Sequence, residues 1–361
     1  MEKTFLHIES LSDLMPFIKD KPEFKVMKQE NGTQVVSYII ATSESFNNIG
    51  SLECRGITFD HNGKIICRPL HKFFNVNERE STQAHVLPWS TVHRVMDKRD
   101  GSMINTCEVN GQIRVKTKKS FTSDVAKVAQ VWFDNNSNYV DFARKMVELN
   151  CTPTFEYTSP SNRIVLAYEE DEMTLLHVRH NFTGEYWTQE HLNMFAMEYG
   201  IKMVELDSWN GSTNFLAEAK NVKGIEGWVI QFRNGDMVKL KTEEYLVSHR
   251  LITFVRERDV AEMVLNENLD DVKSAMLERN ISLEKLHNVE HRVLTMLREL
   301  EVEVDEAYEM DKNMSRKDFA SKYTGHKYFG LIMQRYSGNE PDYVDYFKKR
   351  LLKEHFGLTS V

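Results

Sequence analysis

The sequence predicts an α+β protein in which a mainly antiparallel β domain precedes an all-helical C-terminal domain. Two observations carry this prediction. Tight-turn signals recur through the first two thirds of the chain, and both helix breakers are missing from most of the remainder. The length of 361 residues is ample for two domains. We expect the β domain to cover residues 1–250 and the helical domain residues 251–361, with the boundary near residues 246–256.

Asn-Gly pairs are the turn signals, because both residues tolerate the positive φ of a tight β-hairpin. We expect a helical stretch over residues 123–149 between two of the hairpins. Three Asn-Gly pairs separate expected strands: Asn62-Gly63 between 56–60 and 64–68, Asn110-Gly111 between 102–109 and 112–118, and Asn234-Gly235 between 228–232 and 237–241.

The C-terminal part has a helical pattern. No glycine occurs between Gly235 and Gly325, and no proline between Pro160 and Pro341. Apolar residues recur there at three- and four-residue steps, which predicts one buried face of a helix and favours core packing over a cofactor role. These residues are Leu286, Val289, Val293, Met296, Leu297 and Leu300.

Composition excludes several classes of protein. The net charge of −8 argues against binding nucleic acid through bulk positive charge, so any such ligand needs a local cationic site. We find no apolar run that suits a signal peptide or a membrane span. The cysteines Cys54, Cys67, Cys107 and Cys151 form no CxxC pair, which argues against a zinc site or a disulfide framework and favours a reducing cytoplasm.

The string KRDGS at residues 98–102 is the strongest local signal for chemistry. A lysine nucleophile must be neutral, and nearby cations or a metal favour that form. Cations at period two share one face of a strand. We expect two such sets to line one groove that keeps Lys98 neutral and holds a triphosphate, although either set alone is more typical of a solvent-exposed sheet face. The sets are Arg114, Lys116 and Lys118, then Lys239 and Lys241.

Two glutamates stand out because each lies within or beside an apolar, strand-like run. Burying Glu156 or Glu226 is costly unless the carboxylate is paired or bound to a metal. With Asp100 they form a candidate triad of oxygen ligands for Mg²⁺ near Lys98. The alternative for either glutamate alone is a solvent-facing position on an alternating strand.

Eight strings in a fixed order resemble the covalent nucleotidyltransferase superfamily of ligases and capping enzymes. RPLHKFFNVNE and SNRIVLAY are most similar to the bacteriophage RNA ligase 1 family of tRNA-repair ligases. The resemblance covers nearly the whole chain and is weaker in the C-terminal part. The strings are LECRGITFD (52–60), RPLHKFFNVNE (68–78), KRDGS (98–102), KTKKS (116–120), FEYTSPSNRIVLAY (155–168), LLHVRHNFTGEY (175–186), IEGWV (225–229) and VKLKTEEY (238–245).

The resemblance implies a role for each matching residue. Lys98 would be the adenylated nucleophile, and Asp100, Glu156 and Glu226 would organise Mg²⁺. The pair Asp270-Asp271 would lie near a second metal ion, although a solvated helix start is equally typical of it. The implied ATP contacts are Tyr38, Arg55, Lys72, Lys118, Lys239, Lys241 and Tyr245.

Two positions depart from the family pattern. Lys119 stands where relatives carry a glycine, so the local backbone is expected to differ. Arg99 stands where relatives often carry an acidic residue, and its charge would disfavour protonation of the neighbouring Lys98. Neither departure removes a proposed catalytic group.

The implied function is that of an ATP-dependent RNA ligase with two Mg²⁺ ions. It would join RNA 3′-hydroxyl and 5′-phosphate ends through a lysyl-AMP intermediate and an adenylylated RNA 5′ end. The expected substrate is a nicked tRNA, recognised in part by the helical domain, with no membrane and no obligate protein partner. We expect a cytoplasmic protein, in the host cell if a phage encodes it.

Two alternatives stay open. A DNA ligase or an mRNA capping enzyme would share the scaffold but usually adds a small β-barrel after the last lysine motif. A non-catalytic RNA-binding protein on the same scaffold would need none of the reactive groups.

Overall fold

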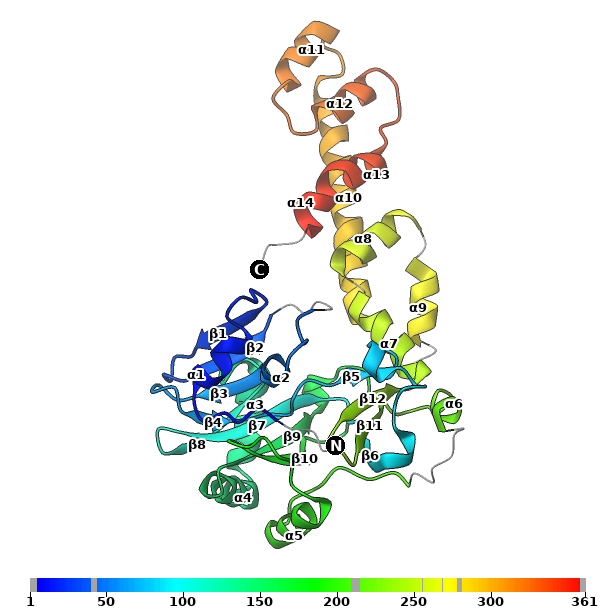
Figure 1. The fold of residues 1–361 in the computed structure, drawn as a ribbon. Coiled ribbons are helices and arrows are strands. Elements are labelled where there is room, and N and C mark those ends of the chain that lie inside the picture. The colour runs from blue at the N-terminus through cyan, green and yellow to red at the C-terminus, as the bar shows by residue number, and fades with distance from the viewer. Residues whose placement is uncertain are drawn as a thin grey trace. The chain divides into compact units, whose positions relative to one another are not determined.

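A computed structural model describes residues 5–39, 44–208, 215–254, 256–267, 269–277 and 281–357 (Figure 1). The side chains of residues 250–254, 271 and 275 lie outside this description. The chain divides into two compact units, residues 1–246 and residues 247–361. The first contains antiparallel sheets with helices, and the described residues of the second form helices, so the expected α+β class is confirmed.

The described strands of the first unit form three four-stranded sheets. Neighbouring strands run antiparallel, except that β5 pairs with β12 in parallel. The sheets consist, in spatial order, of β1 (Phe24–Lys28), β2 (Gln34–Tyr38), β3 (Arg55–Phe59) and β4 (Ile65–Cys67); of β10 (Glu172–His180), β9 (Cys151–Thr158), β7 (Ser102–Val109) and β8 (Gln112–Lys116); and of β5 (Phe74–Asn75), β12 (Met237–Lys241), β11 (Gly227–Phe232) and β6 (Val92–Asp97).

All three hairpins with Asn-Gly turns are present, as the pairs β3–β4, β7–β8 and β11–β12. Asn110 and Gly111 both have positive φ, +52° and +77°, which is the conformation that a type I′ turn requires. The β8 strand ends at Lys116, two residues earlier than expected. Lys118 therefore lies beyond the sheet and does not share its period-two alternation.

The helical stretch expected over residues 123–149 consists of two helices, α3 (Asp124–Asp134) and α4 (Ser137–Glu148). The Ser123 side chain accepts a hydrogen bond from the Ala126 N–H and caps α3. Phe142 and Met146 of α4 share one core with residues of β9 and of α5 (Gln189–Tyr199). The helices α4 and α5 cover the same face of the sheet that contains β9 (Figure 1). The shorter helices of this unit are α1 (Leu11–Leu14), α2 (Ile49–Glu53) and α6 (Phe215–Ala219).

The helix α7 (Glu243–Phe254) contains the boundary between the two units. In the second unit, the buried residues Leu286, Val289, Val293 and Leu300 form one face of the long helix α10. The predicted apolar stripe is therefore part of the core. The helices are α8 (Glu257–Leu265), α9 (Leu269–Leu277), α10 (Glu284–Asp311), α11 (Arg316–Tyr323), α12 (Phe329–Tyr336), α13 (Tyr343–Tyr346) and α14 (Leu352–Phe356), with a π-helical turn at Phe347–Leu351.

Over the described residues, none of these helices combines the length and the apolar character needed to cross a membrane.

Candidate active site

Lys98 directly follows β6, and its backbone N–H donates a hydrogen bond to the Gly227 carbonyl at 2.9 Å. The β11 strand lies between β6 and β12, and it pairs Trp228 with Asp97 and Gly227 with Lys241. The residue after β6, the residue before β11 and the last residue of β12 therefore meet at one end of three adjacent strands.

Glu226, the residue before β11, lies between two amines at this end. Its Oε1 is 2.7 Å from Lys98 Nζ and 2.9 Å from Lys241 Nζ. The Glu226 side chain is only 3% exposed, whereas both lysines are about one-fifth exposed. A buried carboxylate needs this pairing, because removal of one partner of a buried ion pair leaves a charge uncompensated. Glu226 thus fixes the positions of both amines.

Asp100 is buried, and both of its carboxylate oxygens accept hydrogen bonds from the protein. Its Oδ2 accepts hydrogen bonds from the N–H groups of Val165 and Leu166 at 2.8 and 2.7 Å, and its Oδ1 accepts one from the Tyr245 hydroxyl at 2.7 Å. The Asp100 N–H donates to the Tyr168 hydroxyl at 3.0 Å. This carboxylate therefore ties the segment after Lys98 to two other motif strings.

These contacts occupy the carboxylate of Asp100, and its expected role as a metal ligand beside Glu156 and Glu226 stays a prediction. In the part of the chain that the structure describes, no three His, Cys, Asp or Glu side chains form a group that could hold a metal ion. The physical reason is that Asp100 already accepts three hydrogen bonds from the protein. Glu156 and Glu226 remain as oxygen donors near Lys98.

Glu156 lies on β9, where it pairs with Met103 of β7 and Thr174 of β10. Burial raises the pKa of its carboxyl to about 7; the nearby Lys98 acts in the opposite direction, and the Glu226 charge adds to the rise. A carboxylate of this kind gains from a cation that compensates its charge. Glu156 and Glu226 together thus fit a divalent cation through hard oxygen atoms.

A cavity of about 220 Å³ contains both Lys98 and Glu156 in its lining. Arg55 and Lys239 add positive charge to it. Its volume is below the roughly 300–1,000 Å³ of typical ligand pockets, so it suits part of a nucleotide and not a whole triphosphate. The apolar part of the lining is made by Leu70, Phe73, Met103, Leu176 and Val229.

Lys239 has no acidic partner among the residues that the structure describes. Burial lowers its pKa well below the ordinary value, and the nearby charges of Arg55 and Lys72 lower it further. No ion-pair partner of Lys239 lies within the described ranges. The guanidinium group of Arg55 also lacks a partner, because its Nη1 is buried without a hydrogen-bond acceptor among the described residues. Two under-compensated cations at one cavity favour an anion such as phosphate.

Tyr38, Lys72 and Lys118 form a neighbouring cationic cluster. Lys118 Nζ lies 3.8 Å and Lys72 Nζ 5.8 Å from the centre of the Tyr38 ring. Burial, with smaller contributions from Lys119 and Arg55, lowers the pKa of Lys118 to about 8. Burial also lowers the pKa of Lys72. Arg55 is thus close to this cluster as well as to Lys239.

Two of the five cations expected in the groove are elsewhere. Lys116 is completely buried, and its Nζ donates to the Gly56 carbonyl at 2.9 Å. Arg114 lines a separate cavity beside α3 and α4. Gly56 has φ +100°, and a Cβ there would lie 2.4 Å from the Lys118 carbonyl oxygen. The contacts of Lys116 and Gly56 therefore hold the start of β3 against Lys118. Arg55 is the first residue of that strand.

Arg99 lines the smaller cavity, but its charge is compensated. Its Nη2 lies 3.0 Å from Glu172 Oε1, and its Nη1 lies 3.9 Å from Asp97 Oδ2. Sequence did not show these two partners, and the expected effect of the Arg99 charge on Lys98 stays a prediction.

The acidic pair lies in the second unit. Asp270 is in α9, its side chain is 94% exposed, and its Oδ1 lies 3.8 Å from Lys273 Nζ. Asp271 is in the same helix, and its side chain lies outside the described residues. Their relation to a second metal ion stays a prediction.

Sequence reasoning missed a buried ionic cluster that supports the site. Glu53 Oε2 lies 2.7 Å from Arg179 Nη1, and Glu53 Oε1 lies 3.0 Å from Arg68 Nη2, with all three side chains almost inaccessible. The Lys72 N–H donates to the Leu52 carbonyl at 2.7 Å. These contacts connect the segments that carry Arg55 and Lys72. One feature of the sequence could have pointed to this cluster: Glu53, Arg68 and Arg179 all lie within the strings that match the family.

Comparisons with known proteins agree on one family. The family described as RNA ligase matches residues 53–245, and the family described as T4 RNA ligase 1, C-terminal domain, matches residues 253–358. A putative RNA ligase of Thermovibrio ammonificans is 29% identical over 73% of this chain and 70% of its own length. RNA ligase 1 of bacteriophage TS2126 is 23% identical over 75% and 70%, respectively.

Solved structures resemble the chain more distantly. An archaeal ATP-dependent RNA ligase has a TM-score of 0.47 at 13% identity, over 81% of this chain and 79% of that one. The chain spans 52% of a Naegleria gruberi RNA ligase structure, with a TM-score of 0.38 at 17% identity over 44% of this chain.

Proposed function

This chain belongs to the RNA ligase family, and we propose that it joins RNA ends in an ATP-dependent reaction in which Lys98 carries AMP. The observation that carries the proposal is the position of Lys98. Its amine shares Glu226 with Lys241 and lines a cavity with Glu156, Arg55 and Lys239. A nucleophile, carboxylates and cations that lack counter-charges are the groups that nucleotidyl transfer needs.

In the first step, Lys98 Nζ forms a bond to the α-phosphorus of ATP, and the bond to the departing pyrophosphate breaks. The amine must lose a proton, and Glu226 is the carboxylate within hydrogen-bond distance of it. Lys239, Lys241 and Arg55 would stabilise the charge on the phosphates. Lys72, Lys118 and Tyr38 would extend this contact to the outer phosphates, because the smaller cavity cannot hold all of them.

In the second step, an oxygen of an RNA 5′-phosphate attacks the same phosphorus and displaces the Lys98 amine, which gives an RNA with an adenylylated 5′ end. In the third step, a 3′-hydroxyl attacks the 5′-phosphate, forms the phosphodiester bond and expels AMP. The protein acts mainly by positioning these groups and by compensating charge.

A divalent cation, proposed to be Mg²⁺, would be held by Glu156 and Glu226, and it would supply positive charge to the phosphate oxygens. The structure supports this by placing both carboxylates beside Lys98. We propose a supporting role for Asp100 and Tyr245, which hold the Lys98 segment through their mutual hydrogen bond.

We propose that the substrate is a nicked tRNA and that the second unit contributes to its recognition. The resemblance of the motif strings to tRNA-repair ligases suggests the substrate, and the match of residues 253–358 to the C-terminal domain of T4 RNA ligase 1 supports a substrate-binding role for the second unit. A joining assay tests it. Full-length protein with ATP and Mg²⁺ should seal a nicked anticodon stem-loop faster than a linear strand with the same ends. Equal rates would contradict the tRNA assignment, and failure to join either substrate would contradict RNA ligation.

A further inference from the structure

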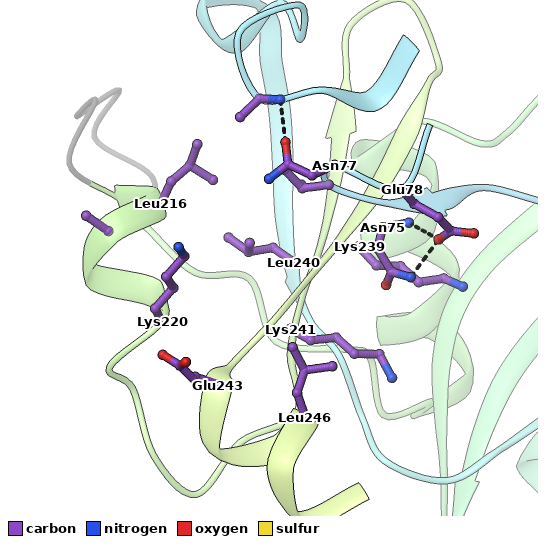
Figure 2. Close-up of a pocket in the computed structure, with 13 residues that line it drawn as sticks. Asn75, Asn77, Glu78, Leu216, Lys220, Lys239, Leu240, Lys241, Glu243 and Leu246 are labelled. Carbon is purple, nitrogen blue, oxygen red and sulfur yellow. Dashed lines mark hydrogen bonds between the residues drawn. The ribbon is translucent and has the colours of Figure 1, made fainter. Parts of the chain in front are cut away.

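A larger cavity, of about 680 Å³, lies beside the lysines of the active site. Lys239 lines both this cavity and the smaller one, and Lys241 lines the larger (Figure 2). The lining comes from β5 and the segment after it, from α6, from β12 and from the start of α7, all within the first unit. Apart from Lys239 and Lys241, none of the residues that line it has a role in the reaction proposed above.

We propose that the larger cavity binds the terminal nucleotide of the RNA strand that carries the 5′-phosphate. This inference rests on the proposed function and assigns a place to one of its substrates.

The first argument is the division of the active-site groups between the cavities. Lys98 and Glu156 line the smaller cavity and do not line the larger one. The phosphate of an adenylate bonded to Lys98 therefore lies at the smaller cavity. The volume of the larger cavity falls within the roughly 300–1,000 Å³ of typical ligand pockets, so it can accept a separate nucleotide.

The second argument is charge. Lys241 Nζ and Lys98 Nζ lie 2.9 and 2.7 Å from the same oxygen of Glu226. An anionic group held at Lys241 is therefore close to a phosphorus atom carried by Lys98. Lys239, which has no ion-pair partner in the described part of the chain, supplies a second amine to the same cavity. A terminal phosphate fits two amines, whereas the strand that ends in a 3′-hydroxyl has no terminal phosphate to place there.

The third argument is the chemistry of the wall. Leu216, Leu240 and Leu246 give an apolar surface, while Asn77 and Glu78 present polar groups. Figure 2 shows Leu216 on the side toward Lys220 and Glu78 on the side of the lysine amines. A nucleoside has the same division, with an apolar base face and polar base edges and ribose hydroxyls. The base would contact the leucines while the phosphate reaches the lysines.

The test separates the first reaction step from the second. Ala217 is exposed on α6 and lines the cavity, so Ala217→Trp fills space without removing a buried group. The neighbouring Glu218 is also exposed and does not line the cavity, so Glu218→Trp is the matched control. The probes are labelled ATP alone for adenylation, then a 5′-phosphorylated oligoribonucleotide added to purified AMP-bound protein.

We expect Ala217→Trp to raise the KM for the 5′-phosphorylated strand at least tenfold while the rate of adenylation by ATP stays within twofold. Glu218→Trp should leave both values near those of the unsubstituted protein. Preserved adenylation also shows that the variant is folded.

Three results would overturn the inference: an unchanged KM for the 5′-phosphorylated strand, a parallel loss of adenylation, which would assign the cavity to ATP, or an effect confined to the 3′-hydroxyl strand in the sealing step. A failure of the proposed function is distinct, because the unsubstituted protein would then form no AMP adduct at all.

Discussion

Lys98 Nζ lies 2.7 Å from Glu226 Oε1, and the buried carboxylate holds the amine at the end of three adjacent strands. The same oxygen also contacts Lys241 at 2.9 Å. One carboxylate therefore sets the position of the proposed nucleophile and of a proposed phosphate-binding cation. Because of this shared contact, we expect the site to be sensitive to substitution of Glu226.

We predict that Glu226→Gln slows formation of the Lys98–AMP adduct by about 100-fold or more, because the amide neither accepts a proton nor compensates two ammonium groups. Quenched-flow measurement with labelled ATP gives the rate. Glu172→Gln is the control, since Glu172 pairs with Arg99 and Lys202 and touches neither amine. An adduct that forms at the normal rate in Glu226→Gln would contradict this role.

A second prediction concerns pH. The pKa of Lys118 is lowered to about 8 by burial first, then by Lys119 and Arg55. Above pH 8 the side chain loses its charge, so kcat/KM for ATP in adenylation should fall if Lys118 contacts the phosphates. Lys118→Arg keeps a cation at these pH values and should remove that fall. An identical fall in Lys118→Arg would assign the pH dependence to another group.

The same lowered pKa has a consequence for stability. The unfolded chain holds the Lys118 proton up to its ordinary pKa of 10.5, whereas the folded chain loses it near pH 8. The unfolded state therefore binds more protons in this window, and this residue makes the free energy of unfolding rise between about pH 8 and 10.5. Chemical denaturation of the Lys118→Arg variant should lack this contribution to the rise.

A third prediction concerns the bond between Tyr245 and Asp100. Tyr245→Phe removes the hydroxyl that donates to Asp100 Oδ1 at 2.7 Å and leaves a buried carboxylate with two backbone donors. We expect a loss of about 1.5–3 kcal/mol in the free energy of unfolding. Tyr199→Phe is the control, because the Tyr199 hydroxyl bonds to none of the described residues. Equal stability in both variants would show that the bond does not support the fold.

A fourth prediction follows from the ion pair of Arg99. Glu172 and Asp97 compensate its charge, so Arg99→Gln should change the adenylation rate less than about threefold and leave its pH profile in place. Adenylation rates measured over a range of pH values check this. A clear shift of the profile would restore the role that the sequence alone had indicated for Arg99.

The fold was largely predictable because its signals are local. Each Asn-Gly turn and its two β-strands span 13 to 15 residues, and the apolar stripe of α10 lies within one helix. The break between α3 and α4 was not predicted. Neither glycine nor proline marks it, and the chain turns at Asn135 and Asn136, whose helix-breaking tendency is weak.

The site was predictable only where a motif places the residue directly. Alternation along a strand suggested that Lys116 and Lys118 share a face, but β8 ends at Lys116, whose amine is buried against Gly56. Which lysine is buried depends on how two sheets pack, and that is not a local property. The same holds for Glu53 and Arg179, which meet from positions 126 residues apart.

Intact-mass spectrometry of the protein after incubation with ATP and Mg²⁺, followed by peptide mapping, tests the central claim most directly. The account predicts one added adenylyl group per chain, mapped to Lys98 and absent from Lys98→Ala. An unmodified protein, or an adenylyl group that persists in Lys98→Ala, would contradict it.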